Sequence, residues 1–286
     1  MRTTLLCVSL LAACNVDDHA PAPPMPTVPI TSANAVLVAR AAVGASLGLA
    51  DVAGIAVAVI TATPPEPTST IPGSGGGEVV RTWDDRDENA RVSTGDLFVL
   101  RFTGFGEDGL VLDGEMSFDS LVVDGDLVNG LSWLLDARLH FDDVAVDSAA
   151  GTTTLRGPLW CSREKRATVM TLDLEPAEGL AVDGGEVAAG TPFAYHDYVL
   201  DFTFAQYGAG AVASDVIGGL VEFETKVPFT GIQVLPDPSV GELEVRGASG
   251  SRLTIRAVDS VDVELLLDAD GDGTAEQTIP LAWSQL

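Results

Sequence analysis

Hydrophobic and polar residues alternate along much of the chain beyond residue 78. In the segment 97–103, Phe98, Leu100 and Phe102 fall on one side of an extended chain, whereas Arg101 and Thr103 fall on the other. Successive side chains of a strand point to opposite faces, so at least one face of such a segment is expected to be buried. Short runs of this kind, separated by Gly and Asp, predict antiparallel strands joined by tight turns.

A weak internal repeat lies within the same region. In each copy two apolar residues end one strand, and an aliphatic-x-Gly step follows on the next. The copies are Phe102/Phe105 with Leu112-x-Gly114, Phe141/Val144 with Leu155-x-Gly157, and Phe204/Tyr207 with Ile217-x-Gly219. Aromatic and Gly positions recur in any β-rich sequence, which is the alternative explanation. Read as hairpins, the copies predict a mainly β fold, either an antiparallel β-sandwich or an incomplete β-barrel of repeated hairpins, with a short N-terminal helical segment.

The stretch 33–63 is rich in Ala, Val, Leu and Gly and holds only two charged residues, Arg40 and Asp51. Asn34 is placed as a helix cap, and the apolar spacing over 36–42 predicts a helix. The second half, 55–61, has β-branched residues in near alternation and fits a strand equally well. A transmembrane helix is a third interpretation. Placing Asp51 near the centre of the bilayer would cost roughly 3 kcal/mol, which counts against it.

The first residues have the features of an export signal, because Arg2 precedes an apolar run, 5–13, that is too short to span a bilayer. The run ends in Leu-Ala-Ala-Cys14, which resembles the lipobox of bacterial lipoproteins. An ordinary signal peptide followed by a chance cysteine is the alternative. The resemblance implies that Cys14 is acylated, becomes the first residue and anchors the chain to a membrane. Asn15 after it implies sorting to the outer membrane, with the body on the periplasmic or cell-surface face.

Composition divides the remaining chain. Residues 14–32 carry five prolines among small polar residues and predict an extended tether. A second Pro- and Gly-rich linker precedes the alternating region. The expected organisation is a signal peptide at 1–13, the lipidated tether at 14–32, an Ala/Val-rich segment with its linker at 33–77, a β domain at 78–240 and a C-terminal β-hairpin module at 241–286.

Charge and cysteine content narrow the function classes. With 15 Lys+Arg against 42 Asp+Glu, the formal net charge is −27, so nucleic acid is excluded as a partner. Once Cys7 leaves with the signal and Cys14 is acylated, Cys161 has no partner for a disulfide. The three histidines are scattered, and neither a zinc spacing nor a nucleophile motif accompanies them. We therefore expect no enzymatic activity.

The segment 85–96 has the ligand spacing of a calcium loop of the EF-hand type. Arg91 at loop position 7 offers its carbonyl, and oxygen-bearing side chains stand at positions 1, 3, 5, 9 and 12, namely Asp85, Asp87, Asn89, Ser93 and Asp96. Ca²⁺ takes roughly six to eight such oxygens. Ala90 replaces the usual Gly at position 6, and the carboxylate at position 12 is the shorter Asp. A solvated acidic turn ahead of the first strand is the alternative.

A second acidic loop follows near the C-terminus, with oxygens again at positions 1, 3, 5 and 9, namely Asp268, Asp270, Asp272 and Glu276. Position 12 is Ile279, so the last ligand of an EF-hand is missing. The loop joins two expected strands, where Asp-Gly is also good turn chemistry. A structural Ca²⁺ and a plain hairpin turn both remain open.

Taken together, the lipobox, TWDDRDENARVSTGDLFVLRFTGF, LVLDGEM and the terminal segment with DADGDG before Trp283 resemble a group of uncharacterised bacterial lipoproteins and secreted proteins. Their shared pattern is an acidic entry, repeated β-hairpins and a C-terminal DxDGDG hairpin. The resemblance implies export and β structure and carries no known activity.

Three functions fit these observations. We expect a lipid-anchored envelope protein with an interaction or scaffolding role towards an unknown protein or glycan partner, its loops stabilised by calcium. The alternative is a carrier that shelters an apolar ligand in a β half-barrel. A glycan-active hydrolase is the third interpretation. A filled core would favour scaffolding, a deep apolar cavity the carrier, and a cleft with carboxylates of split pKa the hydrolase.

Overall fold

The computed structural model describes residues 26–62, 66–107, 109–148, 151–182, 185–186, 193–195, 203–232, 235 and 237–286. The expected signal peptide and the acylated Cys14 lie outside the described residues, as does most of the tether. His19 and the pair His196-Asp197 also lie outside them.

One long helix runs through the centre of the molecule. It consists of α1 (Ala35–Val43), a π-helical turn η1 (Gly44–Gly48) and α2 (Leu49–Thr61). Its second half is therefore helical, which settles the helix-or-strand ambiguity of 55–61. By length and composition alone the helix could cross a membrane, but most of it is buried inside the protein. A helix that is apolar all round is suited to such a core position.

Asn34 stands at the N-cap position but does not cap the helix with its side chain. Its Oδ1 instead accepts a hydrogen bond from the amide of Thr31, and its Nδ2 donates to the carbonyl of Pro29. The predicted cap was therefore wrong in its bonding, because Asn34 closes the turn that leads into the helix.

The first sheet is antiparallel and follows the helix in the chain. Its strands lie in the order β1 (Thr68–Pro72), β2 (Gly76–Asp84), β3 (Leu97–Glu107), β4 (Leu110–Gly125), β5 (Ser132–Ser148), β6 (Gly151–Arg166), β7 (Val169–Pro176) and β10 (Phe193–Tyr195). The short strand β8 (Ala181–Val182) pairs with β6, and β9 (Gly185–Glu186) pairs with β8.

The second sheet is also antiparallel, with the strand order β11 (Thr203–Gln206), β13 (Gly219–Ile232), β14 (Val240–Arg246), β15 (Arg252–Ala257), β16 (Asp262–Asp268) and β17 (Gln277–Ala282). β12 (Ala209–Ser214) also pairs with β13, and short 3₁₀ turns occur at Ala248–Gly250 and Trp283–Gln285. The chain changes sheet between 195 and 203. The boundary expected at 240/241 lies at the start of β14, which pairs with β13 in the same sheet.

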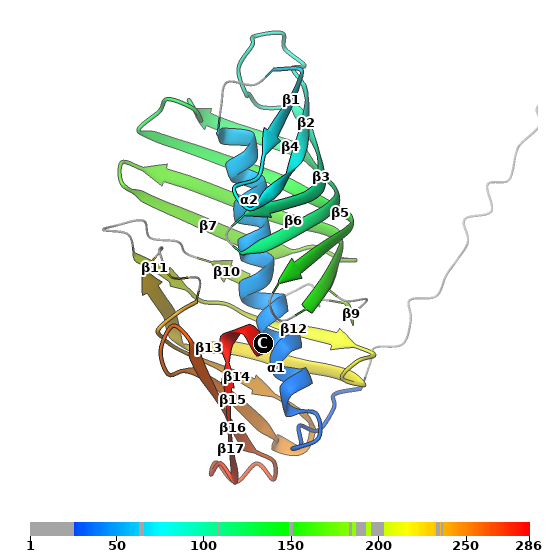
Figure 1. The fold of residues 1–286 in the computed structure, drawn as a ribbon, viewed down its shortest axis with the longest axis vertical. Helices are drawn as coiled ribbons and strands as arrows, with labels where there is room; N and C mark the ends of the chain where they lie inside the picture. Colours follow the sequence, from blue (N-terminus) through cyan, green and yellow to red (C-terminus); the bar gives the residue numbers. More distant parts are fainter. Residues whose placement is uncertain are drawn as a thin grey trace, which may run out of the picture.

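Both sheets lie against the central helix, which follows the long axis of the molecule (Figure 1). The first sheet curves beside α2, and the second lies alongside α1 and η1 (Figure 1). The buried apolar residues of helix and sheets form one cluster. The fold is thus mainly β, as expected, and neither sheet closes into a barrel within the described part of the chain.

Two of the three predicted repeat copies are the same bulged hairpin. In β3–β4, Phe102 pairs with Gly114 and Phe105 with Leu112, and the register shifts between them. In β5–β6, Phe141 pairs with Gly157 and Val144 with Leu155, with the same shift. Both glycines have positive φ, 123° and 94°, which a Cβ would oppose.

The third copy is different. Phe204 lies on β11 and pairs with Gly231, whereas Gly219 pairs with Ser214 across the β12–β13 turn. The apolar residues and the Gly step of this copy therefore do not face each other, and the prediction of a third equivalent hairpin was wrong.

A buried arginine ties the helix to the first sheet. Arg81 of β2 is fully buried, and its Nη1 donates to the carbonyl of Val59 at 3.0 Å while its Nε donates to Ser69 Oγ at 3.1 Å. The Val59 carbonyl belongs to the last turn of α2, where carbonyls lack helical partners and a cation is favoured. Burial lowers the pKa of Arg81, and the charge of Glu66 partly offsets this.

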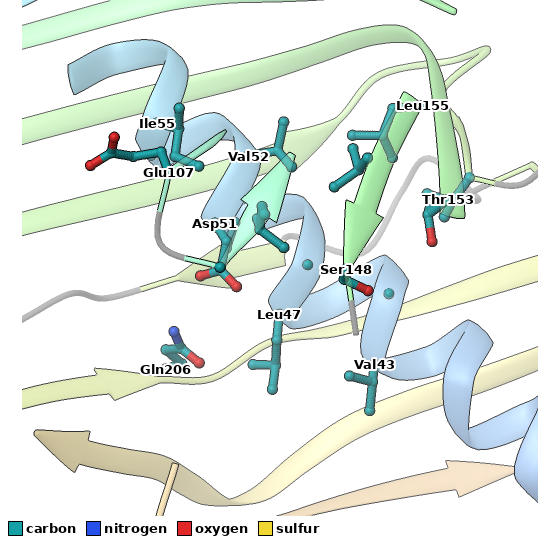
Figure 2. A pocket seen from close by; sticks show the side chains of 18 of the residues that line it. Val43, Leu47, Asp51, Val52, Ile55, Glu107, Ser148, Thr153, Leu155 and Gln206 are labelled. Carbon is teal, nitrogen blue, oxygen red and sulfur yellow. The ribbon is translucent and has the colours of Figure 1, made fainter. Parts of the chain in front are cut away.

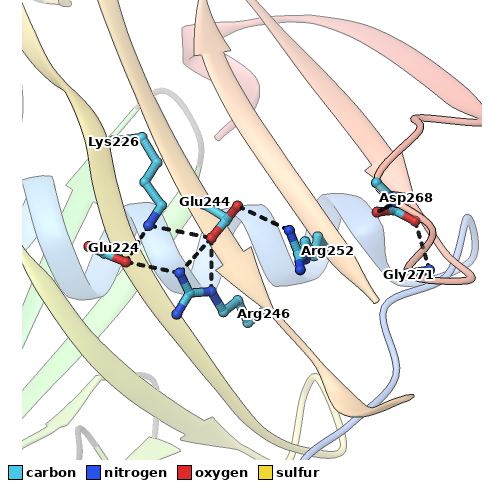
Figure 3. A network of polar contacts seen from close by, with 8 residues as sticks. Glu224, Lys226, Glu244, Arg246, Arg252, Asp268 and Gly271 are labelled. Atoms are coloured by element: carbon cyan, nitrogen blue, oxygen red, sulfur yellow. Dashed lines mark hydrogen bonds and ion pairs between the residues drawn. The ribbon is translucent and has the colours of Figure 1, made fainter. Parts of the chain in front are cut away.

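The face of the second sheet turned away from the helix carries a network of ion pairs (Figure 3). Glu224 on β13 lies directly opposite Glu244 on β14, an arrangement that is unfavourable by itself. Arg246 bridges both carboxylates, with Nη2 at 3.0 Å from Glu224 and 2.8 Å from Glu244, and Lys226 pairs with both as well. Because Glu224, Lys226 and Arg246 are partly exposed to solvent, the network neutralises the repulsion and adds little further stability.

Candidate functional site: two acidic hairpin loops and an apolar groove

The first predicted calcium loop connects β2 to β3, and the second connects β16 to β17. Carboxylate oxygens of Asp85, Asp87 and Asp96 lie within 4.8 Å of one another in the first loop. Oxygens of Asp268, Asp270, Asp272 and Glu276 do so in the second. Both clusters could therefore hold a metal ion, and they are the groups of this kind found among the described residues.

The two loops share one pattern of internal hydrogen bonds. In the first loop, the amide of position 6, Ala90, donates to Asp85 at 2.7 Å, and the amides of positions 5 and 7 donate to the side chains of positions 3 and 5. In the second loop, the amide of Gly273 donates to Asp268 at 2.9 Å, and the next two bonds of the pattern recur. Residues at the same loop position therefore make the same hydrogen bonds in both loops.

The backbone conformations agree as well. Positions 4 and 6 have positive φ in each loop, at Glu88 (56°) and Ala90 (58°) in the first and at Gly271 (78°) and Gly273 (90°) in the second. Residues other than Gly rarely adopt such backbone angles. The first loop therefore keeps the left-handed turn that Gly normally provides, even though the sequence has Ala90 there.

A closing carboxylate is present in both loops at different sequence positions. Asp96, at position 12, accepts the amide of Arg86 at 3.1 Å, and Glu276, at position 9, accepts the amide of Ala269 at 2.8 Å. Arg86 and Ala269 both occupy position 2. Glu276 therefore takes the place that Ile279 leaves empty, which the EF-hand spacing alone did not reveal.

The other two predicted ligands of the first loop lie beside Asp87. Asn89 donates its Nδ2 to Asp87 at 2.7 Å, and the Ser93 hydroxyl donates to the same Oδ2 at 3.1 Å. The Oδ1 of Asn89 accepts the amide of Arg91. Desolvation acts to raise the pKa of Asp87, but the hydrogen bonds from Ser93 and its other neighbours outweigh it and lower the pKa.

The second loop is electrostatically strained. The amide of Asp272 donates to Asp270, which is the largest influence and lowers its pKa, yet the pKa of Asp270 is raised overall. Desolvation and the carboxylates of Asp272 and Glu276 produce the rise. Carboxylates that repel one another around a common point are a chemical setting that a divalent cation stabilises.

A large groove lies along the central helix, between it and the sheets. Its volume is about 1310 Å³. Figure 2 shows Val43, Leu47, Asp51 and Ile55 in succession on the helix face turned to the groove. The opposite walls carry mainly apolar side chains, among them Ile71, Phe105, Leu110, Val146, Leu155, Met170, Leu172, Phe204, Val212, Leu235 and Trp283.

The helix contributes a regular stripe to this groove. Among the helix residues that line the groove, eight recur at spacings of four and three, namely Leu37, Ala41, Gly44, Gly48, Asp51, Ile55, Ala58 and Ala62. Residues so spaced lie on one face of a helix. Most of them are small, which leaves room beside the backbone, and a Cβ added at Gly48 would meet no atom within 4 Å. Sequence reasoning missed the groove, because the stretch 33–63 is apolar on every side and its pattern does not single out this face.

Cys161 is buried in the first sheet. Burial, followed by the nearby charge of Asp136, raises the pKa of its thiol to about 12, so the thiolate is almost absent at neutral pH. A buried thiol of this kind acts as a small packing group. His140 lies on β5 opposite Pro158, away from both loops in the chain.

The comparisons with known proteins give no identification. Neither protein-family models, curated proteins nor solved structures match the chain. The geometry of the loops and the groove therefore carries the functional argument.

Proposed function

We propose that the protein is a non-catalytic binding protein of the cell envelope that holds an apolar ligand in the groove beside its central helix. The observation that carries the proposal is the cavity of about 1310 Å³. Ligand pockets are typically about 300–1,000 Å³, mostly apolar, with a few polar groups. A scaffolding protein needs no such space, so the cavity gives the carrier more support than the scaffolding role.

The lining is suited to binding rather than to catalysis. Its walls are mainly aliphatic and aromatic, and its charged residues come from separate elements. A groove flanked by two open sheets also leaves a way in for a ligand that is longer than it is wide.

Binding is testable with N-phenyl-1-naphthylamine, an apolar dye whose fluorescence rises when it leaves water. We expect saturable binding at one class of sites, reversed by dodecanol. Fluorescence that increases only linearly with dye, with no displacement by dodecanol, would remove the support for a carrier.

We propose further that Ca²⁺ occupies both acidic loops as a structural ion. The support is that both loops have the same hydrogen-bond pattern, the same two left-handed positions and a closing carboxylate. Titrating Ca²⁺ into protein stripped with EDTA should give heat and a rise in melting temperature. If neither is observed, the loops are acidic hairpin turns only.

Attachment to the outer membrane through a lipid on Cys14 is the third part of the proposal, resting on the lipobox. Mass spectrometry of the mature protein should show an acylated N-terminal cysteine, and Cys14→Ser should release the chain from the membrane fraction. An unmodified N-terminus elsewhere would show ordinary secretion instead. The partner to which a bound ligand passes would be another envelope component, a protein or a glycan-bearing surface.

A further inference from the structure

Acidic side chains outnumber basic ones among the charged residues that line the groove. Among the described residues they are Asp51, Glu107 and Asp237 on the acidic side, and Arg40 and Arg163 on the basic side. Asp51 comes from the helix, Glu107 from the end of β3 and Asp237 from the segment between β13 and β14. The carboxylates thus reach the groove from three separate elements.

Both arginines direct their guanidinium groups towards carbonyls of the protein. Arg40 donates its Nε to the carbonyl of Gln285 at 2.7 Å. Arg163 donates Nη1 to the carbonyl of Gly54 at 3.3 Å, and its Nη2 lies 3.4 Å from the sulfur of Met170. These contacts hold the helix against the C-terminus and against β6. Both Nη groups of Arg163 and the Nε of Arg40 thus face protein atoms, whereas three carboxylates line the same groove.

Asp237 is the least satisfied of the acidic groups. It is half-buried, and no described residue donates a hydrogen bond to it. Desolvation raises the pKa of its carboxyl. A partly buried carboxylate without a partner is unfavourable, and a cation placed beside it would relieve this cost.

The shape of the groove restricts the ligand further. Its helix stripe extends from Leu37 to Ala62, and at about 1.5 Å per residue this corresponds to a length of roughly 37 Å. A slender hydrocarbon chain matches such a groove better than a compact molecule does. The net charge of −27 adds a long-range attraction for cations.

We infer that the groove takes an elongated amphiphile with a single hydrocarbon chain and a cationic amine, for which Asp237, with Asp51 and Glu107, supplies the counter-charge. This inference rests on the proposed carrier function and adds the chemical class of the ligand to it. Charge selects the headgroup, and the apolar walls hold the chain.

The test compares decylamine, decanol and decanoate as competitors of N-phenyl-1-naphthylamine, all below their aggregation concentrations. The salt concentration is kept at 0.5 M to screen attraction to the outer surface. We expect decylamine to bind about tenfold more tightly than decanoate. Asp237→Asn should reduce this preference several-fold and leave decanol affinity unchanged. Asp124→Asn removes the same charge from an exposed position on β4 and should have no effect.

The outcomes separate the two proposals. Equal affinity for the three competitors, or an amine preference that Asp237→Asn leaves intact, would overturn the amine assignment while keeping the carrier function. Preference for decanoate would overturn it as well. Failure of all three to displace the dye would remove the carrier function itself.

Discussion

The indole nitrogen of Trp83 donates a hydrogen bond to Oδ2 of Asp96 at 3.1 Å, and this contact joins the first acidic loop to the core of the first sheet. Trp83 stacks on Phe98 with ring centroids 6.3 Å apart, and both rings are buried. Asp96 is itself fully buried and also accepts the amides of Arg86 and Ser93. The loop is therefore held in shape by the protein before any ion binds.

Replacing Asp96 should destabilise the whole first sheet. Asp96→Ala leaves three donors without their acceptor, and each buried donor left unsatisfied costs about 1–3 kcal/mol. Because water can reach part of the emptied site, we expect a loss of about 3 kcal/mol in the free energy of unfolding, measured by urea denaturation. Asp124→Asn, at an exposed position, should change it by less than about 0.5 kcal/mol. Equal effects of the two changes would mean that Asp96 does not organise the loop.

Asp270→Asn should raise the melting temperature of the protein in the absence of calcium and lower it in the presence of calcium. The pKa of Asp270 is raised above its unfolded value, so its ionised form opposes folding. The protonated carboxyl of Asp270 contributes to stability in full below the unfolded pKa, and this contribution is lost as pH rises through the folded pKa. In EDTA at neutral pH the variant should therefore melt at a higher temperature than the wild type. With calcium the order should reverse, because a ligand is missing.

The pH dependence provides a second check on the same site. In EDTA, the melting temperature of the wild type should rise relative to that of Asp270→Asn as pH falls from 7 towards 4, because protonation of Asp270 relieves the repulsion. Thermal melts in calcium and in EDTA at three pH values would measure both effects. A variant that tracks the wild type under every condition would rule out repulsion and ion binding at this loop.

The buried contact between Arg81 and the end of the central helix should contribute measurably to stability. Arg81→Met keeps the apolar volume but leaves the Val59 carbonyl without its charged donor, and hydrogen bonds to charged groups contribute about 1.5–3 kcal/mol. We expect a loss of about 2 kcal/mol by urea denaturation. Arg101→Met, which removes an exposed ion pair with Glu115 on the next strand, serves as the matched control and should have a much smaller effect. If Arg81→Met is as mild as the control, the guanidinium does not hold the helix.

The strands and the acidic loops were predictable because their signals are local. Alternation fixed the buried face of β3, and the spacing of Asp, Asn and Gly fixed where the loops begin. The closing role of Glu276 was missed because the sequence template places that ligand at position 12. Which carboxylate reaches the amide of position 2 depends on the path of the chain back into the next strand.

The groove could not be predicted in the same way. The stretch 33–63 is apolar on every side, so its composition fits a core helix, a strand or a membrane span. The helix packs against two sheets that come from separate parts of the chain. This packing buries Val57 and Ile60 and leaves the side of the helix that carries Gly48 and Ala58 uncovered. Non-local packing also decides that the third repeat copy pairs differently from the first two.

A substitution at Gly48 can show whether this groove binds an apolar ligand. It has ordinary helical backbone angles, and the space beside it is open. Both Gly48→Ala and Gly48→Leu should raise the free energy of unfolding, by up to about 1 kcal/mol, because Gly is a poor helix former. Only the leucine should project far enough to fill the groove.

The measurement is the dissociation constant of N-phenyl-1-naphthylamine for these two variants and the wild type. We expect Gly48→Ala to bind the dye like the wild type, and Gly48→Leu to bind it at least about tenfold more weakly, a difference of about 1.4 kcal/mol, while being as stable as the alanine variant. Unchanged binding by a folded Gly48→Leu protein would place the dye elsewhere and would rule out the groove as its binding site.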